Sequence, residues 1–168
     1  MATIDSGASS GSVTCRLAWP LGSSQAWEIT ARVSIVAAGG GLTRWVDVGV
    51  EYADAKTVVM QLDSAGGGTA RTRGGGSQGS ISGGTLALPL LCWTRLRVDH
   101  GRITVSVSES ASGPWSCCAE GTGLVSSGLT PAISYLYLAA NMSGGANATN
   151  TYTIDLLAVT DLDPRPTL

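Results

Sequence analysis

Charged side chains are scarce in this 168-residue sequence. They make up 13% of the residues, against roughly a quarter in average globular proteins, and phenylalanine is absent. Glycine, in contrast, occurs 23 times. The surface must therefore consist largely of Ser, Thr, Gly and Ala. Such a surface repels its neighbours weakly, which suits a protein packed against other subunits in an assembly. A soluble, glycine-rich domain is an equally compatible interpretation.

An excess of positive charge is also missing. The formal net charge is −2 and the pI is near 5.2, whereas nucleic-acid-binding proteins usually gather Lys and Arg on one face. The only local basic cluster, Arg71 and Arg73, lies in a glycine-rich run with too few repeats for an RGG segment. We therefore expect no nucleic-acid partner.

Long apolar runs are lacking as well. No segment approaches about 18 consecutive apolar residues, so we expect no membrane span and no membrane partner. Residues 1–11 have neither the basic start nor the apolar run of a secretory signal, which indicates a protein made in the cytoplasm.

Metal-binding spacings are absent from the four cysteines and the single histidine. Cys15 and Cys92 lie in apolar strand-like segments and are expected as small core residues. Cys117 and Cys118 are adjacent, so they are compatible with a vicinal disulfide or a link to another chain, but reduced thiols are favoured in a reducing compartment. His100 lies in a predicted turn. We expect no zinc site and no cofactor.

The stretch from Trp93 to Trp115 predicts a β-hairpin. If His100-Gly101 forms a two-residue turn, the strands place apolar residues on one face and polar residues on the other. Glycine adopts positive φ freely and histidine tolerates it. The facing apolar pairs are Val98 with Ile103, Leu96 with Val105, and Thr94 with Val107. The polar pairs are Arg97 with Thr104, Arg95 with Ser106, and the opposite charges Asp99 and Arg102 beside the turn.

Two-residue alternation recurs along most of the chain, and no segment keeps a helical period. Strands are expected over 13–17, 27–35, 45–51, 57–62, 86–91, 135–138 and 151–160, besides the hairpin. Residues 66–84 hold nine glycines and indicate a long loop or a thin hairpin. Ser108–Thr130 is interpreted as a glycine- and serine-rich connection.

This pattern predicts an all-β fold, a two-sheet antiparallel β-sandwich with a jelly-roll topology. We expect a flexible N-terminal arm over 1–11, a single sandwich domain over 12–161, and a C-terminal tail over 162–168.

The hairpin region resembles the concanavalin A-like, laminin-G-type jelly rolls. The resemblance is carried by a W-x-x-L-x-V…G-x-x-V-x-V-S hairpin, by a G-x-W close, and by the strand from Tyr152 to Val159. The residues concerned are Trp93, Leu96, Val98, Gly101, Ile103, Val105, Val107, Ser108, Gly113 and Trp115. It covers residues 85–161.

Glycosidases of that superfamily carry an E-x-D-x-x-E cluster on one strand. The nearest match here is Glu51 and Asp54, whose three-residue spacing would point them to opposite faces of a strand. With a single histidine, His100, a hydrolase triad has little to build on either. We therefore expect a protein that is not an enzyme.

Sugar binding is one function that the resemblance implies, because such domains can present aromatic rings to pyranoses. The candidate carbohydrate platform is Trp45, Trp115, Tyr135 and Tyr137, with Asn141 and Asp47 as hydroxyl partners. Each of these aromatic residues is also compatible with a place in the core. The scattered asparagines do not support a calcium site.

A structural function is the other implication, because related sandwiches occur in tailed-phage particles as decoration, head-fibre and tail proteins. The nine-to-one excess of Arg over Lys agrees with an interface protein. On this interpretation, the protein is a capsid decoration (cement) subunit on the surface of the virion. Its partners would be other virion proteins and copies of itself, with Ile4, Asp5, Arg71 and Arg73 as assembly contacts.

Overall fold

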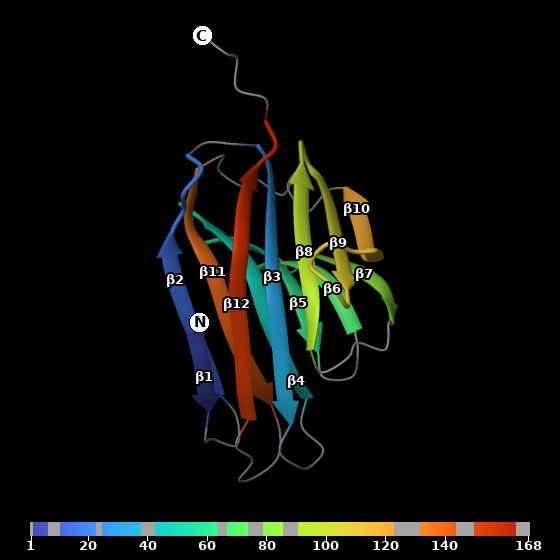
Figure 1. Cartoon of the computed structure of the whole chain (residues 1–168). Helices are drawn as coiled ribbons and strands as arrows, with labels where there is room; N and C mark the ends of the chain where they lie inside the picture. The colour runs from blue at the N-terminus through green and yellow to red at the C-terminus, as the bar shows by residue number, and fades with distance from the viewer. Residues whose placement is uncertain are drawn as a thin grey trace.

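A computed structural model of the chain describes residues 2–6, 11–22, 25–37, 43–63, 67–73, 79–85, 91–122, 132–143 and 150–163. Within these ranges the structure contains twelve strands and no helix, in two antiparallel six-stranded sheets that stack as a sandwich (Figure 1). The all-β, two-sheet prediction is confirmed.

Sheet A has the order β1-β12-β3-β8-β9-β10. Its strands are β1 (Ala2–Ser6), β12 (Asn150–Asp161), β3 (Ala26–Ala37), β8 (Leu91–Asp99), β9 (Arg102–Ser108) and β10 (Ser116–Thr122). Sheet B has the order β2-β11-β4-β5-β6-β7. Its strands are β2 (Gly11–Ala18), β11 (Ile133–Ser143), β4 (Thr43–Tyr52), β5 (Thr57–Asp63), β6 (Gly67–Arg73) and β7 (Gly79–Thr85).

The core lies between the sheets and is built from alternating strand positions. In β3 every second side chain from Trp27 to Val33 is buried, as the apolar alternation predicts. In β4 the inward valines alternate with Asp47, Gly49 and Glu51, which are buried as well. The two indoles of Trp19 and Trp27 meet edge to face, with centroids 5.5 Å apart. The inward residues of these two strands are Trp27, Ile29, Ala31, Val33, Val46, Val48 and Val50.

The predicted hairpin is β8–β9, and its register is confirmed residue by residue. His100 and Gly101 have φ of 45° and 93°, the positive values that a two-residue turn between twisted strands requires. The expected partnership of Asp99 with Arg102 needs correction. Their backbones pair, but the Asp99 carboxylate contacts Arg97 and His100, while Arg102 reaches Glu120 on β10.

The structure adds detail to three segments of the sequence interpretation. The glycine-rich 66–84 region forms the thin-hairpin alternative, since β6 and β7 pair. β10 lies inside the segment interpreted as a connection, and a bulge between Cys117 and Ala119 breaks the alternation that would have revealed it. Part of the expected N-terminal arm, Ala2–Ser6, is β1 and pairs with β12. The predicted strand over 86–90 lies outside the described residues.

Candidate functional site

Three of the four candidate aromatic residues lie on one face of sheet B, the face that points away from the core. Trp45 alternates with buried Val46 on β4, and Tyr135 and Tyr137 alternate with buried Leu136 on β11. β11 pairs with β4 so that Tyr135 faces Glu51 and Tyr137 faces Gly49. We call this surface the outer face of sheet B.

The same face also carries a buried amide–carboxyl cluster. The Asp47 carboxyl accepts hydrogen bonds from Gln61 Nε2 at 2.9 Å and from Asn141 Nδ2 at 3.0 Å. Asp47 is fully buried, and both amides are nearly so. A buried carboxyl is tolerated only when hydrogen bonds replace its hydration. Asp47 and Asn141, predicted as sugar-hydroxyl partners, therefore bond to each other across β4 and β11 instead of facing solvent.

The accessible part of the face centres on Arg16, Glu51 and Tyr137. Arg16 Nε lies 3.0 and 2.9 Å from the two oxygens of Glu51, whose side chain is only 11% exposed. The same guanidinium lies 5.8 Å from the centroid of the Tyr137 ring. Arg16 belongs to this face because β2 pairs with β11 and places Arg16 opposite Tyr137. Arg16 was not among the predicted site residues, although its alternation with Cys15 and Leu17 indicated the outward face.

The two ends of the face carry further aromatic surface. Tyr135 is 42% exposed, whereas Tyr137 and Trp115 are half-buried. Trp45 is half-buried, and its Nε1 has no hydrogen-bond partner in the described part of the chain. From Tyr135 to Asn141, which faces Trp45, the sheet extends about 20 Å at the usual rise per residue.

Trp115 lies elsewhere. Its ring is 4.5 Å from the guanidinium carbon of Arg95, a residue of β8 in sheet A. Arg95 alternates with buried Leu96, so it points away from the core on the other side of the sandwich. The structure therefore separates Trp115 from the other three aromatic candidates.

The predicted assembly contacts are located by their backbone. Ile4 and Asp5 lie on β1 opposite Tyr152 and Thr151 of β12. Arg71 lies on β6 opposite Val59 of β5, and Arg73 opposite Thr57. The two pairs belong to different sheets, so the structure does not bring them together as one contact surface.

Within the part of the chain that the structure describes, acidic groups do not converge as the glycosidase pattern requires. Asp54 lies in the turn after β4 and pairs with Lys56 at 2.8 Å, which lowers the pKa of its carboxyl through hydrogen bonds and charge. Asp47 and Glu51 share one face of β4 but are engaged by different partners, the amides and Arg16. Four residues along a strand span about 13 Å, which is longer than the carboxyl separations of glycosidases.

The residues that the structure describes contain no group of three or more His, Cys, Asp or Glu side chains arranged to hold a metal ion. None of their elements is a helix with the length and apolar character needed to cross a membrane.

Comparison with known proteins finds likeness in structure and not in sequence. No family model matches the chain, and no curated protein matches its sequence. Among solved structures, the exoplasmic/lumenal domain of VIP36 in its Ca²⁺- and mannose-bound form superposes with a TM-score of 0.60. The identity is 11%, over 97% of this chain and 78% of that one.

Two further structures have similar scores. The GH16 protein of the Bacteroides ovatus mixed linkage glucan PUL, in complex with a G4G4G3G product, has 16% identity and a TM-score of 0.52, over 78% of this chain and 69% of its own. The CBM2 module of the evolved Dit of Lactobacillus casei BL23 phage J-1 has 12% identity and a TM-score of 0.50, over 92% and 71%. The chain spans only 28% of the GH43 protein BlXynB from Bacillus licheniformis.

These likenesses, together with the two stacked antiparallel sheets, establish the fold class. The chain is a concanavalin A-like jelly-roll β-sandwich.

Proposed function

We propose that this protein binds carbohydrate through the outer face of sheet B and does not cleave it. The observation that carries the proposal is the placement of Tyr135 and Tyr137 at successive outward positions of β11, beside the Arg16–Glu51 pair. Sugar rings present apolar C–H faces that pack on aromatic rings, and hydroxyls that need both donors and acceptors. Arg16 supplies donors and Glu51 supplies acceptors within one short stretch of the sheet.

The buried cluster lies beside this surface, on the same face of sheet B. Asp47, Gln61 and Asn141 join three neighbouring strands through side-chain hydrogen bonds. Such a network holds the strands in one register, so the neighbouring aromatic rings lose little freedom when a ligand packs on them. Preorganisation of this kind is expected of a binding surface.

The absence of catalysis is part of the proposal. Hydrolysis needs one carboxyl group as acid and a second, close by, as base or nucleophile. On this face the Asp47 carboxyl is fully buried, and the Glu51 carboxyl is paired with Arg16. Incubation with candidate polysaccharides should therefore produce no new reducing ends with the parent protein, and none with the Glu51→Gln variant. Any turnover abolished by Glu51→Gln would refute this part.

A glycan array tests the binding itself. Tyr137→Ala and Tyr135→Ala are expected to lose retention while keeping the parental melting temperature, because both side chains lie on the outside. Trp115→Ala is the matched control, since it removes an aromatic ring from the opposite sheet. Equal losses in all three variants would assign the binding elsewhere, and a flat array with the parent protein would contradict the proposal.

A second candidate function is a structural place on a phage particle, as a capsid decoration or tail component. The support is the resemblance drawn from the hairpin and the similarity to a module of a phage J-1 protein. Co-sedimentation with phage particles, together with light scattering of the isolated chain, tests it. Binding that Arg71→Ala and Arg73→Ala weaken would support this candidate, and a monomer that ignores particles would exclude it.

A further inference from the structure

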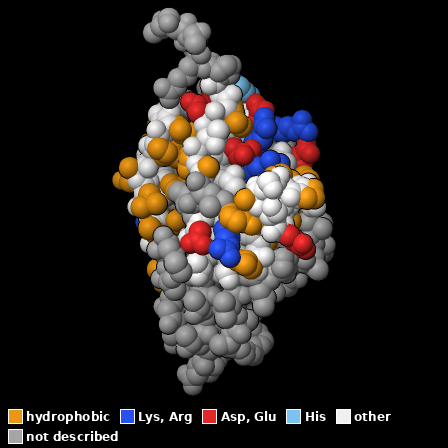
Figure 2. Space-filling view, viewed as in Figure 1, with side chains coloured by type: hydrophobic (Ala, Val, Ile, Leu, Met, Phe, Trp, Pro, Cys, Tyr) orange, Lys and Arg blue, Asp and Glu red, His pale blue; other side chains and the backbone are white. Residues whose placement is uncertain are grey.

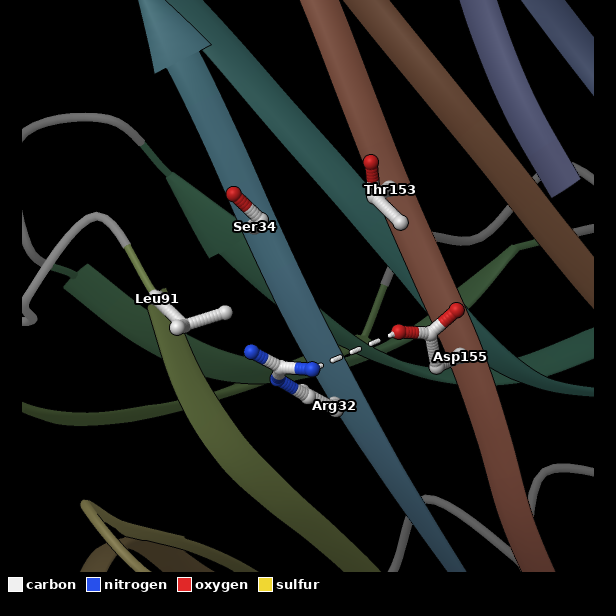
Figure 3. Close-up of a pocket in the computed structure, with 5 residues that line it drawn as sticks. All are labelled: Arg32, Ser34, Leu91, Thr153 and Asp155. Carbon is white, nitrogen blue, oxygen red and sulfur yellow. Dashed lines mark ion pairs between the residues drawn. The ribbon is translucent and has the colours of Figure 1, made fainter. Parts of the chain in front are cut away.

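A separate hollow opens on the outer face of sheet A, on the opposite side of the sandwich. It has a volume of about 330 Å³ and lies across β8, β3 and β12 (Figure 3). The register explains how it forms. Ser34 of β3 pairs with Leu91 and with Thr153, and Arg32 of the same strand pairs with Trp93 and with Asp155. The residues that line it are Arg32, Ser34, Leu91, Thr153 and Asp155.

Asp155 and Trp93 orient the Arg32 guanidinium, but its N–H groups remain able to donate hydrogen bonds to a ligand. Its Nη1 lies 3.9 Å from Asp155 Oδ2, beyond hydrogen-bond distance, and its central carbon lies 5.8 Å from the centroid of the Trp93 ring. No hydrogen bond to this guanidinium is present among the described residues. Both charged side chains reach solvent, with exposed fractions of 42% and 31%. Figure 3 shows them turned toward each other at one end of the hollow.

The remaining lining residues supply two other chemistries. The hydroxyls of Ser34 and Thr153 lie at the end of the hollow away from the ion pair, and each can donate and accept a hydrogen bond (Figure 3). Leu91 forms an apolar side wall and is 44% exposed. The hollow thus combines a planar donor, a carboxylate acceptor, two hydroxyls and an apolar wall.

We propose that this hollow is a binding site for one neutral sugar residue. The hydroxyls of a sugar ring both donate and accept hydrogen bonds, so they match the charged groups and hydroxyls of the hollow. The C–H face of the ring is apolar and matches Leu91. Arg32 and Asp155 cancel in charge, which favours a neutral ligand over a free carboxylate or phosphate. The volume is near the lower limit for ligand pockets, as suits one ring and not a chain.

A sugar site here would give the molecule two binding faces that point in opposite directions. A chain with back-to-back sites can bridge two glycans, or hold one surface with increased avidity. Figure 2 shows that the surrounding face of sheet A carries intermixed positive and negative side chains. The site uses no residue of sheet B, so it stands or falls separately from the proposed function.

Titration followed by two-dimensional NMR tests this site directly. The probes are the methyl glycosides of mannose, galactose and glucose, with sodium acetate as the charged comparison. At least one glycoside should shift the Arg32 side-chain N–H and Leu91 methyl signals in a saturable way. Arg32→Ala should weaken that binding about tenfold or more, because charged hydrogen bonds are lost.

Two variants keep the result interpretable. Asp155→Asn retains shape and should also weaken binding, which covers the case in which Arg32→Ala fails to fold. Arg97→Ala is the matched control, because Arg97 lies on the same strand face as Trp93 and pairs with Asp99 at 3.2 Å outside the hollow. It should leave the affinity unchanged.

Three outcomes would overturn the proposal: no glycoside shifts these signals, acetate binds more tightly than every glycoside, or Arg97→Ala weakens binding as much as Arg32→Ala. Tyr135→Ala, measured in the same titration, reports on sheet B alone. If Tyr135→Ala loses glycoside binding and Arg32→Ala does not, the proposed function is supported and this second site is excluded.

Discussion

His100 Nε2 lies 3.3 Å from Asp163 Oδ1, and this contact joins the tip of the β8–β9 hairpin to the residues that follow β12. Oδ2 of the same carboxylate accepts hydrogen bonds from the backbone N–H groups of Gln25 and Ala26, at 2.8 and 3.3 Å. Asp99 Oδ1 lies 3.0 Å from the other imidazole nitrogen. A single histidine therefore lies between two carboxylates.

The stability of this corner should depend on pH. The hydrogen bond to Asp99, followed by the charge of Asp163, raises the pKa of His100 above its ordinary value of 6.5. Because the folded pKa is the higher one, the stabilisation is fully present below pH 6.5 and is lost as the pH rises through the folded pKa. The imidazole is exposed, so solvent keeps the effect small.

His100→Asn tests this dependence, because asparagine also accepts positive φ in a two-residue turn. Its melting temperature should fall below that of the parent protein in mildly acidic buffer and approach it in mildly alkaline buffer. An NMR titration of the parent should give a His100 pKa above 6.5. A deficit that is the same at every pH would show that the turn geometry, and not the ion pairs, is responsible.

Gly49→Ala should destabilise the sandwich. A Cβ at this position would lie 2.6 Å from the Cα of Val59 and closer still to the carbonyl oxygen of Val58, so β4 and β5 would have to move apart. Overpacking against backbone costs about 1–3 kcal/mol. Urea unfolding measures the loss, and Thr104→Ala, on an outward position of β9, should change stability by less than about 0.5 kcal/mol. Equal stability of the two variants would contradict the close approach.

Asp47→Asn should cost stability although it changes almost no volume. The carboxyl accepts from both Gln61 and Asn141, whereas an amide presents one oxygen and would turn its own N–H₂ toward the second donor. A buried polar group left unpaired costs about 1–3 kcal/mol. Asp54→Asn, in an exposed turn, is the control and should unfold like the parent. Parental stability of Asp47→Asn would show that the cluster does not brace the strands.

The two neighbouring cysteines should differ sharply in reactivity. Cys117 is exposed, whereas burial, followed by the charges of Cys117 and Cys92, raises the pKa of the Cys118 thiol to about 11. Burial alone raises the pKa of Cys92 to about 11 as well. At neutral pH an alkylating reagent should label Cys117 rapidly and leave Cys118 and Cys92 as thiols.

Mass spectrometry of the alkylated peptides locates the label. Cys117→Ser should remove the fast phase, and mild denaturant should restore labelling of the two buried thiols. Fast modification of Cys118 in the folded protein would show that the inward side of β10 opens readily.

The strands were predictable where the alternation is uninterrupted. In the β8–β9 hairpin, and in β3 from Trp27 to Ser34, the side chains face the predicted side, because one buried face fixes the register of a strand. The alternation fails at β10, where the bulge after Cys117 shifts the pattern by one residue. It also gave no warning that the outward residues Asp47 and Gln61 would be buried.

The composition of the candidate sites was less predictable than the strands. Trp115 was grouped with Tyr137 because both are aromatic, but they lie on opposite sheets. Arg16 reaches Glu51 across 35 residues, and Arg32 meets Asp155 across more than a hundred. Neither pair can be predicted from the local spacing of residues, because its members are far apart in the sequence.

What the sequence alone determined is the all-β class and the inward or outward direction of each regular strand, because a period of two residues is a local property of the chain. Only the tertiary structure decided which strands are neighbours, and hence which outward side chains share a surface. That choice depends on pairing strands that are distant in sequence, and it separates the face bearing Tyr135 and Tyr137 from the hollow around Arg32.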